Sequence, residues 1–379
     1  MESFKIDNPT ILHFGKDVVN DLGETIEKFG NRVMVIYGGG SVKKNGIYDR
    51  IMEQLNRIGA EVIEFSGIKP NPIVDDVNAA AEKGKEFQPD VILAVGGGSV
   101  IDSAKVLSLA IPCEHSPWRI MLNMAKPTTA IPLITILTLA ATGTEMNSIA
   151  VLQNVETHKK IPIRSDLIYP KHSFLDPQNT FSVPKDYTAY GVADLIAHAM
   201  EAWFGKGIAT LSDRFVISII LEAVENGPLL LNDLHNYELR ARIMYAATQA
   251  LNGFTMYGRV SGEWGVHAIG HILSLLYDTP HGASLSVVYP AWLKLMKDRI
   301  PKRIQEFGKE VFNSASADET ISDLEDFFIS IDAPVRMNEI GIGEDKKPEI
   351  IDIMIKNKVN GMHYKLSKED IRRIVEFMY

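Results

Sequence analysis

The feature that most constrains the fold is a change of pattern near the middle of the 379-residue chain. Before residues 182–186, apolar strand-like runs alternate with helix-like runs, and after them the strand-like runs largely vanish. Alternating strands and helices predict a parallel sheet covered by helices, whereas helix-like runs alone predict a helical layer. The sequence therefore predicts an α/β domain over residues 1–183 and an all-helical domain over residues 184–379.

Short apolar runs bounded by turn-forming residues mark the expected strands of the first domain. These strands are expected at residues 32–37, 61–65 and 89–95, and helices between them at residues 47–58, 75–87 and 100–110. In the second domain, glycine and proline are expected to break the helices. The expected breaks are Gly205–Gly207, Gly227–Pro228, Gly258 and Thr279–Pro280.

Two glycine-rich turns, Gly38–Gly40 and Gly96–Gly98, follow predicted strands and lead into predicted helices. Glycine lets the backbone approach an anion closely, and a helix N-terminus offers unpaired N–H groups to a phosphate. Neither turn has the G-x-G-x-x-G pattern, and each read singly is also compatible with an ordinary tight turn. The second turn, which follows a wholly apolar run, is the better candidate for a dinucleotide pyrophosphate. Asp102 is expected in the first turn of the next helix, either stabilising the helix dipole or contacting the cofactor.

The first turn bears on which dinucleotide binds. Enzymes that use NAD(H) usually place an acidic residue where it accepts a hydrogen bond from the adenosine ribose, and that carboxylate would repel a 2′-phosphate. Here the turn holds glycine, Ser41, Lys43 and Lys44, and the next acid along the chain is Asp49. The sequence therefore favours NADP(H), with either lysine as a contact to the 2′-phosphate or as part of a solvated surface.

One carboxylate and three imidazoles form a candidate metal site: Asp194, His198, His267 and His281. Asp194 and His198 are four residues apart, so a helix would present both on one face. Such a pair can also be a simple hydrogen bond. However, these histidines lie in apolar, small-residue segments, where burying polar groups is costly unless something binds them. A set rich in nitrogen suits Fe(II) or Zn(II), with Ni(II) and Mn(II) also possible by chemistry, and does not suit calcium or magnesium.

Composition limits the partners and the compartment. A formal net charge of −9 argues against nucleic acid and anionic membrane surfaces as partners. Cys113 is the single cysteine, so no intramolecular disulfide can form. The first residues lack a signal-peptide pattern, and the longest apolar run, Ala130–Ala141, is too short to span a bilayer. We expect a cytoplasmic protein with no membrane contact.

Several motifs occur in the order seen in iron-containing (group III) alcohol dehydrogenases. They are Gly96–Lys105 (GGGSVIDSAK), Thr138–Glu145 (TLAATGTE), Leu175–Pro177 (LDP), Asp194-x-x-x-His198, and His267-x-x-x-His271 followed by His281–Gly282. Over essentially its full length the chain resembles this family, and most of all its NADPH-dependent butanol dehydrogenase branch. The combination of motifs is specific, although no single motif is.

The resemblance implies a Rossmann-like dinucleotide-binding domain and an all-α domain, the architecture shared with dehydroquinate synthase, with one metal in the cleft between them. It implies hydride transfer between NADP(H) and a small primary alcohol or aldehyde such as butanol or butanal, favouring aldehyde reduction, and a homodimer that associates through residues 4–14. Carried over by position, Asp194, His198, His267 and His281 resemble the metal ligands and His271 the proton-relay histidine. The residues that resemble cofactor contacts are Gly38, Gly39, Ser41, Lys44, Gly97, Gly98, Ser99, Asp102, Thr138, Thr142, Asn147 and Lys160.

Two other functional classes stay open at this point. A dehydroquinate-synthase-like lyase or a dehydrogenase of phosphorylated polyols would need several basic residues at the substrate. Between Tyr245 and Ser286 the only lysine or arginine is Arg259. A non-catalytic NADP(H) sensor is the remaining class, against which the complete ligand set and His271 argue.

Overall fold

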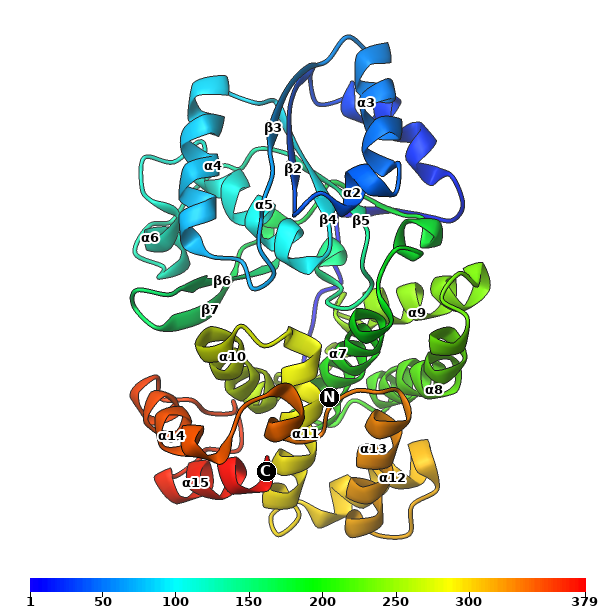
Figure 1. Cartoon of the computed structure of the whole chain (residues 1–379), viewed down its shortest axis with the longest axis vertical. Coiled ribbons are helices and arrows are strands. Elements are labelled where there is room, and N and C mark those ends of the chain that lie inside the picture. The colour runs from blue at the N-terminus through cyan, green and yellow to red at the C-terminus, as the bar shows by residue number, and fades with distance from the viewer. The chain divides into compact units, whose positions relative to one another are not determined.

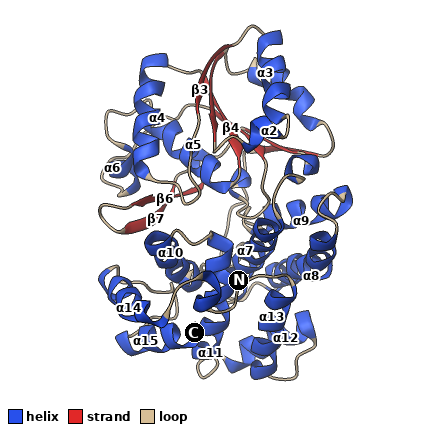
Figure 2. Ribbon diagram, viewed as in Figure 1, coloured by secondary structure: helices blue, strands red, loops and turns tan.

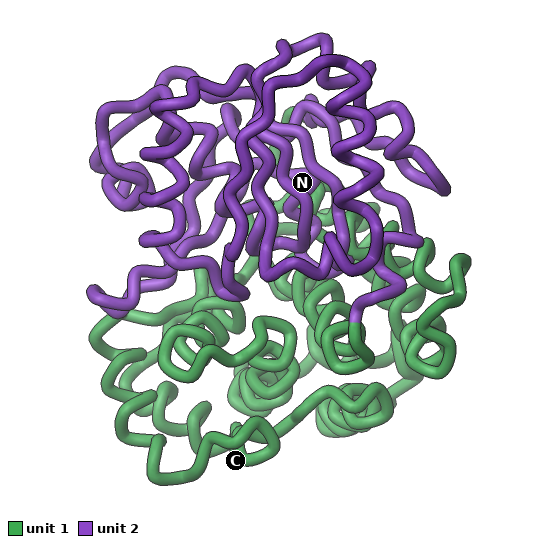
Figure 3. Tube along the Cα trace, turned by 45° about the horizontal axis from the view of Figure 1, so that its top comes forward, with its two compact units in different colours: residues 1–6, 184–379 green, residues 7–183 purple.

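The computed structural model describes residues 1–379 and divides them into two compact units (Figure 3). Residues Asp7–Val183 form the first, called the α/β unit below, and Pro184–Tyr379 together with Met1–Ile6 form the helical unit. All eight strands lie in the α/β unit. Figure 2 shows the strands in red. This is the predicted combination of a parallel α/β domain and an all-helical domain.

The first six residues belong to the helical unit, although the sequence pattern placed them in the α/β domain. The Glu2 N–H donates to the carbonyl of Gly258 at 3.0 Å. The Phe4 ring stacks on the Tyr257 ring with 5.3 Å between ring centroids. Because these contacts join segments more than 250 positions apart in the sequence, no local pattern could reveal them.

A parallel sheet, of which β2, β3, β4 and β5 are labelled in Figure 1, forms the centre of the α/β unit. It has six strands in the order β1-β8-β5-β4-β2-β3. A separate antiparallel hairpin pairs β6 with β7. The central strand β4, VILAVG, is buried along its whole length, as expected for a strand covered on both faces. The strands are β1 Ile11–Phe14, β2 Arg32–Tyr37, β3 Glu61–Phe65, β4 Val91–Gly96, β5 Leu133–Leu137, β6 Ile149–Asn154, β7 Lys159–Arg164 and β8 His172–Leu175.

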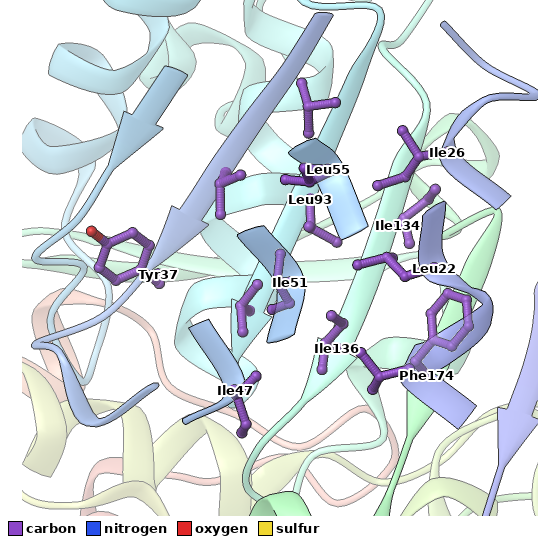
Figure 4. Close-up of a cluster of buried hydrophobic side chains, with 14 of the residues drawn as sticks. Leu22, Ile26, Tyr37, Ile47, Ile51, Leu55, Leu93, Ile134, Ile136 and Phe174 are labelled. Atoms are coloured by element: carbon purple, nitrogen blue, oxygen red, sulfur yellow. The ribbon is translucent and has the colours of Figure 1, made fainter. Parts of the chain in front are cut away.

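Helices cover both faces of this sheet. On one face, side chains from α1 and α3 pack over β4, β5 and β8 (Figure 4). On the other face, Met34 of β2 approaches Gly84 of α4, where an added Cβ would lie 3.2 Å from the Met34 sulfur. The helices are α1 Leu22–Ile26, α2 Ser41–Lys44, α3 Ile47–Arg57, α4 Val74–Phe87, α5 Gly98–Ala110 and α6 Pro117–Met121, with short 3-10 turns η1 Val18–Asp21, η2 Thr144–Met146, η3 Asp166–Ile168 and η4 Pro177–Thr180.

The strands and helices predicted in this unit are confirmed. Predicted strands 32–37 and 61–65 coincide with β2 and β3, and 89–95 corresponds to β4. Predicted helices 47–58, 75–87 and 100–110 correspond to α3, α4 and α5 within two residues at each end.

The helical unit is arranged around α7 and α11, which pack on each other. Nearly every residue of α11 is buried, including the aromatic residues Tyr289 and Trp292. The helices are α7 Lys185–Trp203, α8 Thr210–Asn232, α9 Tyr237–Ala250, α10 Gly265–Tyr277, α11 His281–Met296, α12 Pro301–Phe312, α13 Ala317–Ser330, α14 Lys347–Lys356 and α15 Lys368–Phe377, with 3-10 turns η5 Met337–Ile340 and η6 Glu344–Lys346.

Three of the four predicted helix breaks are confirmed, and the break at Gly227–Pro228 is wrong, because α8 runs through both residues. Pro228 stands near the C-terminal end of α8, where few helical turns follow the hydrogen bond it cannot make. Gly227 serves packing, since a Cβ there would lie 3.1 Å from Val192 Cγ1 of α7. By length and composition alone α8 could also cross a membrane, but it packs on α7 and α9, and core helices share that composition.

Candidate metal centre and dinucleotide-binding turns

Three helices of the helical unit bring four candidate metal ligands together. Helix α7 provides Asp194 and His198, α10 provides His267, and α11 provides His281. From Asp194 Oδ1 the distances are 3.9 Å to His267 Nε2 and 3.8 Å to His281 Nε2. Donor atoms of these three residues all lie within 4.8 Å of one another. One carboxylate and two imidazoles at this spacing can hold a divalent transition metal.

His198 lies beside this group but outside the set of three. Its Nδ1 is 3.2 Å from Asp194 Oδ1, and its ring centroid is 4.5 Å from that of His267. The Nδ1 atom is buried and makes no hydrogen bond. Burial lowers the pKa of His198 to about 4, which keeps the imidazole neutral, the form that binds metals. A buried nitrogen without a hydrogen bond beside the carboxylate and two further imidazoles fits a fourth ligand.

Glu201 is a site residue that the sequence analysis missed. It is fully buried and its Oε1 accepts from His267 Nδ1 at 2.8 Å and from the His267 backbone N–H at 3.1 Å. Its Oε2 accepts from the Trp264 backbone N–H. Burial raises the pKa of the Glu201 carboxyl to about 8, although the N–H donors favour the carboxylate. The signal was present in the sequence, because Asp194, His198 and Glu201 follow the i, i+4, i+7 spacing of one helix face.

His271 lies one turn beyond His267 on α10 and is partly exposed. Its ring centroid is 5.5 Å from that of His281. Trp264 is also beside the cluster, with its ring centroid 5.4 Å from that of His267. Phe254, which precedes α10, contacts the rings of Phe215 and Tyr257.

In the α/β unit, the turn Gly38–Gly40 joins β2 to α2, which begins at Ser41. An added Cβ would meet nothing within 4 Å at Gly39 or Gly40, and Gly40 has a left-handed φ of 100° that favours glycine. Lys44 is exposed at the end of α2, whereas the Lys43 amino group lies over the Tyr48 ring, 4.3 Å from its centroid. The turn therefore has open space above two of its glycines.

An acidic residue, Glu64, lies near this turn, although the sequence predicted no acidic residue there before Asp49. Glu64 of β3 accepts from the hydroxyls of Tyr37 at 2.6 Å and Tyr48 at 2.7 Å, and lies 3.7 Å from Lys43 Nζ. Burial alone would raise the pKa of Glu64, but the two phenols and Lys43 lower it overall. Parallel pairing of β2 with β3 places this residue opposite Val35, close to the turn in space but distant in sequence.

The second turn, Gly97–Gly98, lies at the start of α5 against the loop that follows β5. An added Cβ at Gly98 would lie 2.8 Å from Thr142 Oγ1, and one at Gly97 would lie 3.2 Å from Leu139 Cβ. Because β4 and β5 are neighbours, Ser99, Thr138 and Thr142 gather at one edge of the sheet. Glycine is required here by the close approach of two segments.

Three predicted cofactor contacts already have partners within the protein. Asp102, which lies in the second turn of α5 and not in the first, accepts from the Thr144 hydroxyl at 2.6 Å and from the Val151 N–H at 2.9 Å. Asn147 Nδ2 donates to the carbonyl of Gly143 at 3.0 Å. Lys160 Nζ donates to Asn71 Oδ1 at 2.8 Å. Asp102 and Asn147 therefore hold the loop after β5 in shape.

Lys105, which the sequence analysis did not single out, anchors the same loop. It is fully buried, and its Nζ lies within 3.0 Å of five oxygens. These are the carbonyls of Thr144, Asn147 and Ile149 and the side-chain oxygens of Thr144 and Asn147. Burial lowers the pKa of Lys105 to about 7, while Asp102 and Glu145 act in the opposite direction.

The chain is similar to known proteins over its full length. Residues 9–177 match the family profile described as "Iron-containing alcohol dehydrogenase", and residues 188–379 match "Fe-containing alcohol dehydrogenase family, C-terminal". The chain is 40% identical to the probable NADH-dependent butanol dehydrogenase 1 of Bacillus subtilis, covering 99% of both chains. It is 33% identical to the NADPH-dependent aldehyde reductase YqhD of Escherichia coli, again over 99% of both. The crystal structure of NADH-dependent butanol dehydrogenase A from Thermotoga maritima superposes with a TM-score of 0.96 at 36% identity, covering 100% of this chain and 99% of that one.

Proposed function

Since the chain belongs to the family of iron-containing alcohol dehydrogenases, whose members use NAD(P)H, we propose that it reduces small aldehydes such as butanal to primary alcohols with NADPH. The observation that carries the proposal is the grouping of Asp194 with His267 and His281, donor atoms within 4.8 Å, beside the buried His198. The donor set suits Fe(II) or Zn(II) equally by chemistry.

Each part of the site has a role in this reaction. A divalent metal held by Asp194 and the three histidines would supply a Lewis acid for the substrate oxygen, and reduced nicotinamide would supply the hydride. Glu201 holds the His267 ring in place through a hydrogen bond of 2.8 Å to Nδ1. His271, partly exposed beside His281, is placed to give a proton to the product oxygen directly or through water.

The first test of this function is turnover of butanal. The purified chain is stripped of metal with a chelator and reloaded separately with Fe(II) and Zn(II), and NADPH oxidation is followed by absorbance. We expect activity only after reloading with at least one of the two metals. A chain that binds the metal and NADPH but oxidises no NADPH with a panel of small aldehydes would instead be a binding protein, such as the NADP(H) sensor.

The preference for NADPH is supported by charge at the first turn. Lys44 is exposed at the end of α2. Glu64 is a carboxylate near the turn, but two tyrosine hydroxyls and Lys43 already contact it. An acid so occupied is a poor acceptor for the ribose hydroxyl that distinguishes NAD(H). The similar proteins carry both NADH and NADPH in their names, so the preference has to be measured for this chain.

Gly39→Asp is the variant that tests this preference. Space around an added Cβ is open at Gly39, so the change adds a carboxylate without a clash. We expect the ratio of kcat/KM for NADPH over NADH to exceed one in the parent and to fall in the variant, because like charge repels the 2′-phosphate. Gly39→Asn, of the same size without the charge, is the matched control. A parent that prefers NADH, or equal losses for both cofactors in the aspartate variant, would contradict the assignment.

One observation disfavours the lyase and the phosphorylated-polyol alternatives. Arg259 is the only lysine or arginine between Tyr245 and Ser286. Its guanidinium is buried and bound to Asp213 at 2.7 Å. An arginine in this position is not available for a phosphorylated or multiply charged substrate.

We also propose that the protein is a cytoplasmic homodimer. Strand β1 is an edge strand of the sheet, and its Ile11 and Phe14 side chains are exposed. An exposed edge with apolar side chains favours pairing with another chain. Light scattering of the purified protein should give twice the 42.1 kDa mass of the chain, and a monomer would contradict the dimer. Fractionation of the source cells tests the compartment.

A further inference from the structure

We propose that Glu201 is a positioning residue of the metal centre, which fixes the orientation and tautomer of His267 and so sets the affinity and geometry of the site. The inference rests on the proposed function only in that it requires a metal at the Asp194 cluster. It does not require that any alcohol or aldehyde is the substrate.

The hydrogen bonds of Glu201 determine which nitrogen of His267 is available. Oε1 of Glu201 lies 2.8 Å from His267 Nδ1. Both oxygens of Glu201 already accept backbone N–H groups, Oε1 from His267 and Oε2 from Trp264, so Glu201 is the acceptor of this bond as well. Nδ1 of His267 then donates the proton, and Nε2 keeps its lone pair. Nε2 is the nitrogen on the side of Asp194, at 3.9 Å from Oδ1. Glu201 therefore presents His267 in the tautomer that can bind a metal next to Asp194.

Glu201 joins the face of α7 that carries Asp194 and His198 to His267 of α10. Asp194, His198 and Glu201 occupy successive turns of one face of α7. Glu201 also accepts from the backbone N–H groups of Trp264 and His267, at the start of α10, where no side chain of α10 itself caps the helix. The ring of His267 is thus fixed to α7 through its side chain and its backbone.

The burial of Glu201 without a basic partner also fits a cation nearby. Glu201 is fully buried, and no lysine or arginine pairs with it. A buried carboxylate without an opposite charge is costly. A divalent ion held by Asp194 and His267 would lower this cost by favouring the ionised form of Glu201.

The competing explanation is that Glu201 only caps α10, and the chain offers a matched control for it. Glu263 is a second fully buried carboxylate in the same unit. Its Oε2 accepts from the backbone N–H groups of His363 at 2.9 Å and Tyr364 at 3.3 Å, and it bonds to no candidate ligand. Glu263→Gln therefore removes a buried charge and an acceptor of backbone hydrogen bonds without touching a histidine of the cluster.

The experiment measures metal binding without turnover. The affinities of the parent, Glu201→Gln and Glu263→Gln for Zn(II) are measured by competition with a chromophoric chelator, and their Co(II) forms by visible absorption. We expect Glu201→Gln to bind Zn(II) about 10–100-fold more weakly, the usual loss when the hydrogen-bond partner of a metal-bound histidine is changed, and to show altered Co(II) bands. Glu263→Gln should lower the melting temperature and leave both metal readouts unchanged. Parent-like Zn(II) affinity and Co(II) bands in Glu201→Gln would overturn the inference.

A measurement on the parent keeps the inference testable if Glu201→Gln does not fold. In the Zn(II)-loaded chain labelled with ¹⁵N-histidine, His267 is expected to carry a proton on Nδ1 and to bind through Nε2, with the signals assigned from a His267→Gln chain. Binding through Nδ1, or an Nδ1 without a proton, would overturn it. A chain that passes these tests but reduces no aldehyde would refute the proposed function and leave the role of Glu201 intact.

Discussion

The role proposed for His271 is proton transfer, which does not require His271 to bind the metal. It stands four residues after His267, so both rings project from one face of α10, and its ring centroid is 5.5 Å from that of His281. A histidine so placed can exchange a proton near neutral pH without being a ligand. Its place at the edge of the cluster, partly exposed, also connects the site to water.

We predict that His271→Ala keeps its metal and loses rate. General acid–base assistance is worth about 10²–10⁴-fold, so kcat with butanal should fall within that range and its pH dependence should change. The measurements are metal content by elemental analysis and kcat between pH 6 and about 9, near and above the ordinary histidine pKa. His235→Ala, which changes an exposed histidine before α9, is the control. A His271→Ala enzyme with parent-like rate and pH profile would show that His271 has only a packing role.

Local spacing predicted some site residues and could not predict others. Asp194 and His198 were found because two ligands on one helix leave a four-residue signature. Glu201 follows the same helical spacing. Its role could not be predicted, because that role depends on its contact with His267 of another helix, α10. Glu64 could not be found at all by spacing, because its contact with Lys43 depends on the pairing of β2 with β3.

The loop between β5 and β6 is the element most dependent on one side chain. Residues of this loop and the start of β6 surround the Lys105 amino group with five oxygens. Thr142 of the same loop approaches Gly98 of the second turn. Lys105 of α5 therefore holds the loop that shapes the proposed cofactor site at this edge of the sheet.

We predict that Lys105→Met weakens cofactor binding and stability together. Each buried oxygen left without a donor costs about 1–3 kcal/mol, so the free energy of unfolding should fall by at least that amount. The dissociation constant for NADPH, measured by fluorescence, should rise because the loop loses its anchor. Lys83→Met is the control, since Lys83 is an exposed lysine with one hydrogen bond to a backbone carbonyl at 2.8 Å. An unchanged NADPH affinity in Lys105→Met would show that the loop keeps its shape without the lysine.

Periodicity predicted the elements well wherever packing and propensity agree. The buried runs that became β2 and β4 are short, apolar and bounded by turn residues. The error at Gly227–Pro228 arose because glycine and proline were read as breakers, whereas in α8 the glycine permits close contact with α7 and the proline stands near the helix end. Tertiary packing keeps α8 as one helix, whereas residue propensity alone predicts a break in it.

The whole molecule divides its tasks between two units with separate cores. All four candidate metal ligands and Glu201 belong to the helical unit, and both glycine turns belong to the α/β unit. The position of the boundary followed from the loss of strand-like runs after residue 183, whereas the return of Met1–Ile6 to the helical unit rests on contacts such as Phe4 with Tyr257. A sequence pattern can mark where one domain core ends. It cannot show that a distant segment, such as the first six residues, packs with the other core.

This division predicts that metal binding and cofactor binding can be lost separately. Asp194→Ala removes the only carboxylate of the ligand group, so its metal affinity should fall by more than the roughly 10–100-fold expected for an outer partner such as Glu201. Its NADPH dissociation constant should stay within about threefold of the parent, because the two cofactor turns belong to the other unit, the first between β2 and α2 and the second between β4 and α5. Lys105→Met is the reciprocal variant, expected to retain full metal content while binding NADPH weakly. Full metal occupancy in Asp194→Ala would contradict the ligand assignment, and loss of NADPH binding together with metal would show that the two sites do not act independently.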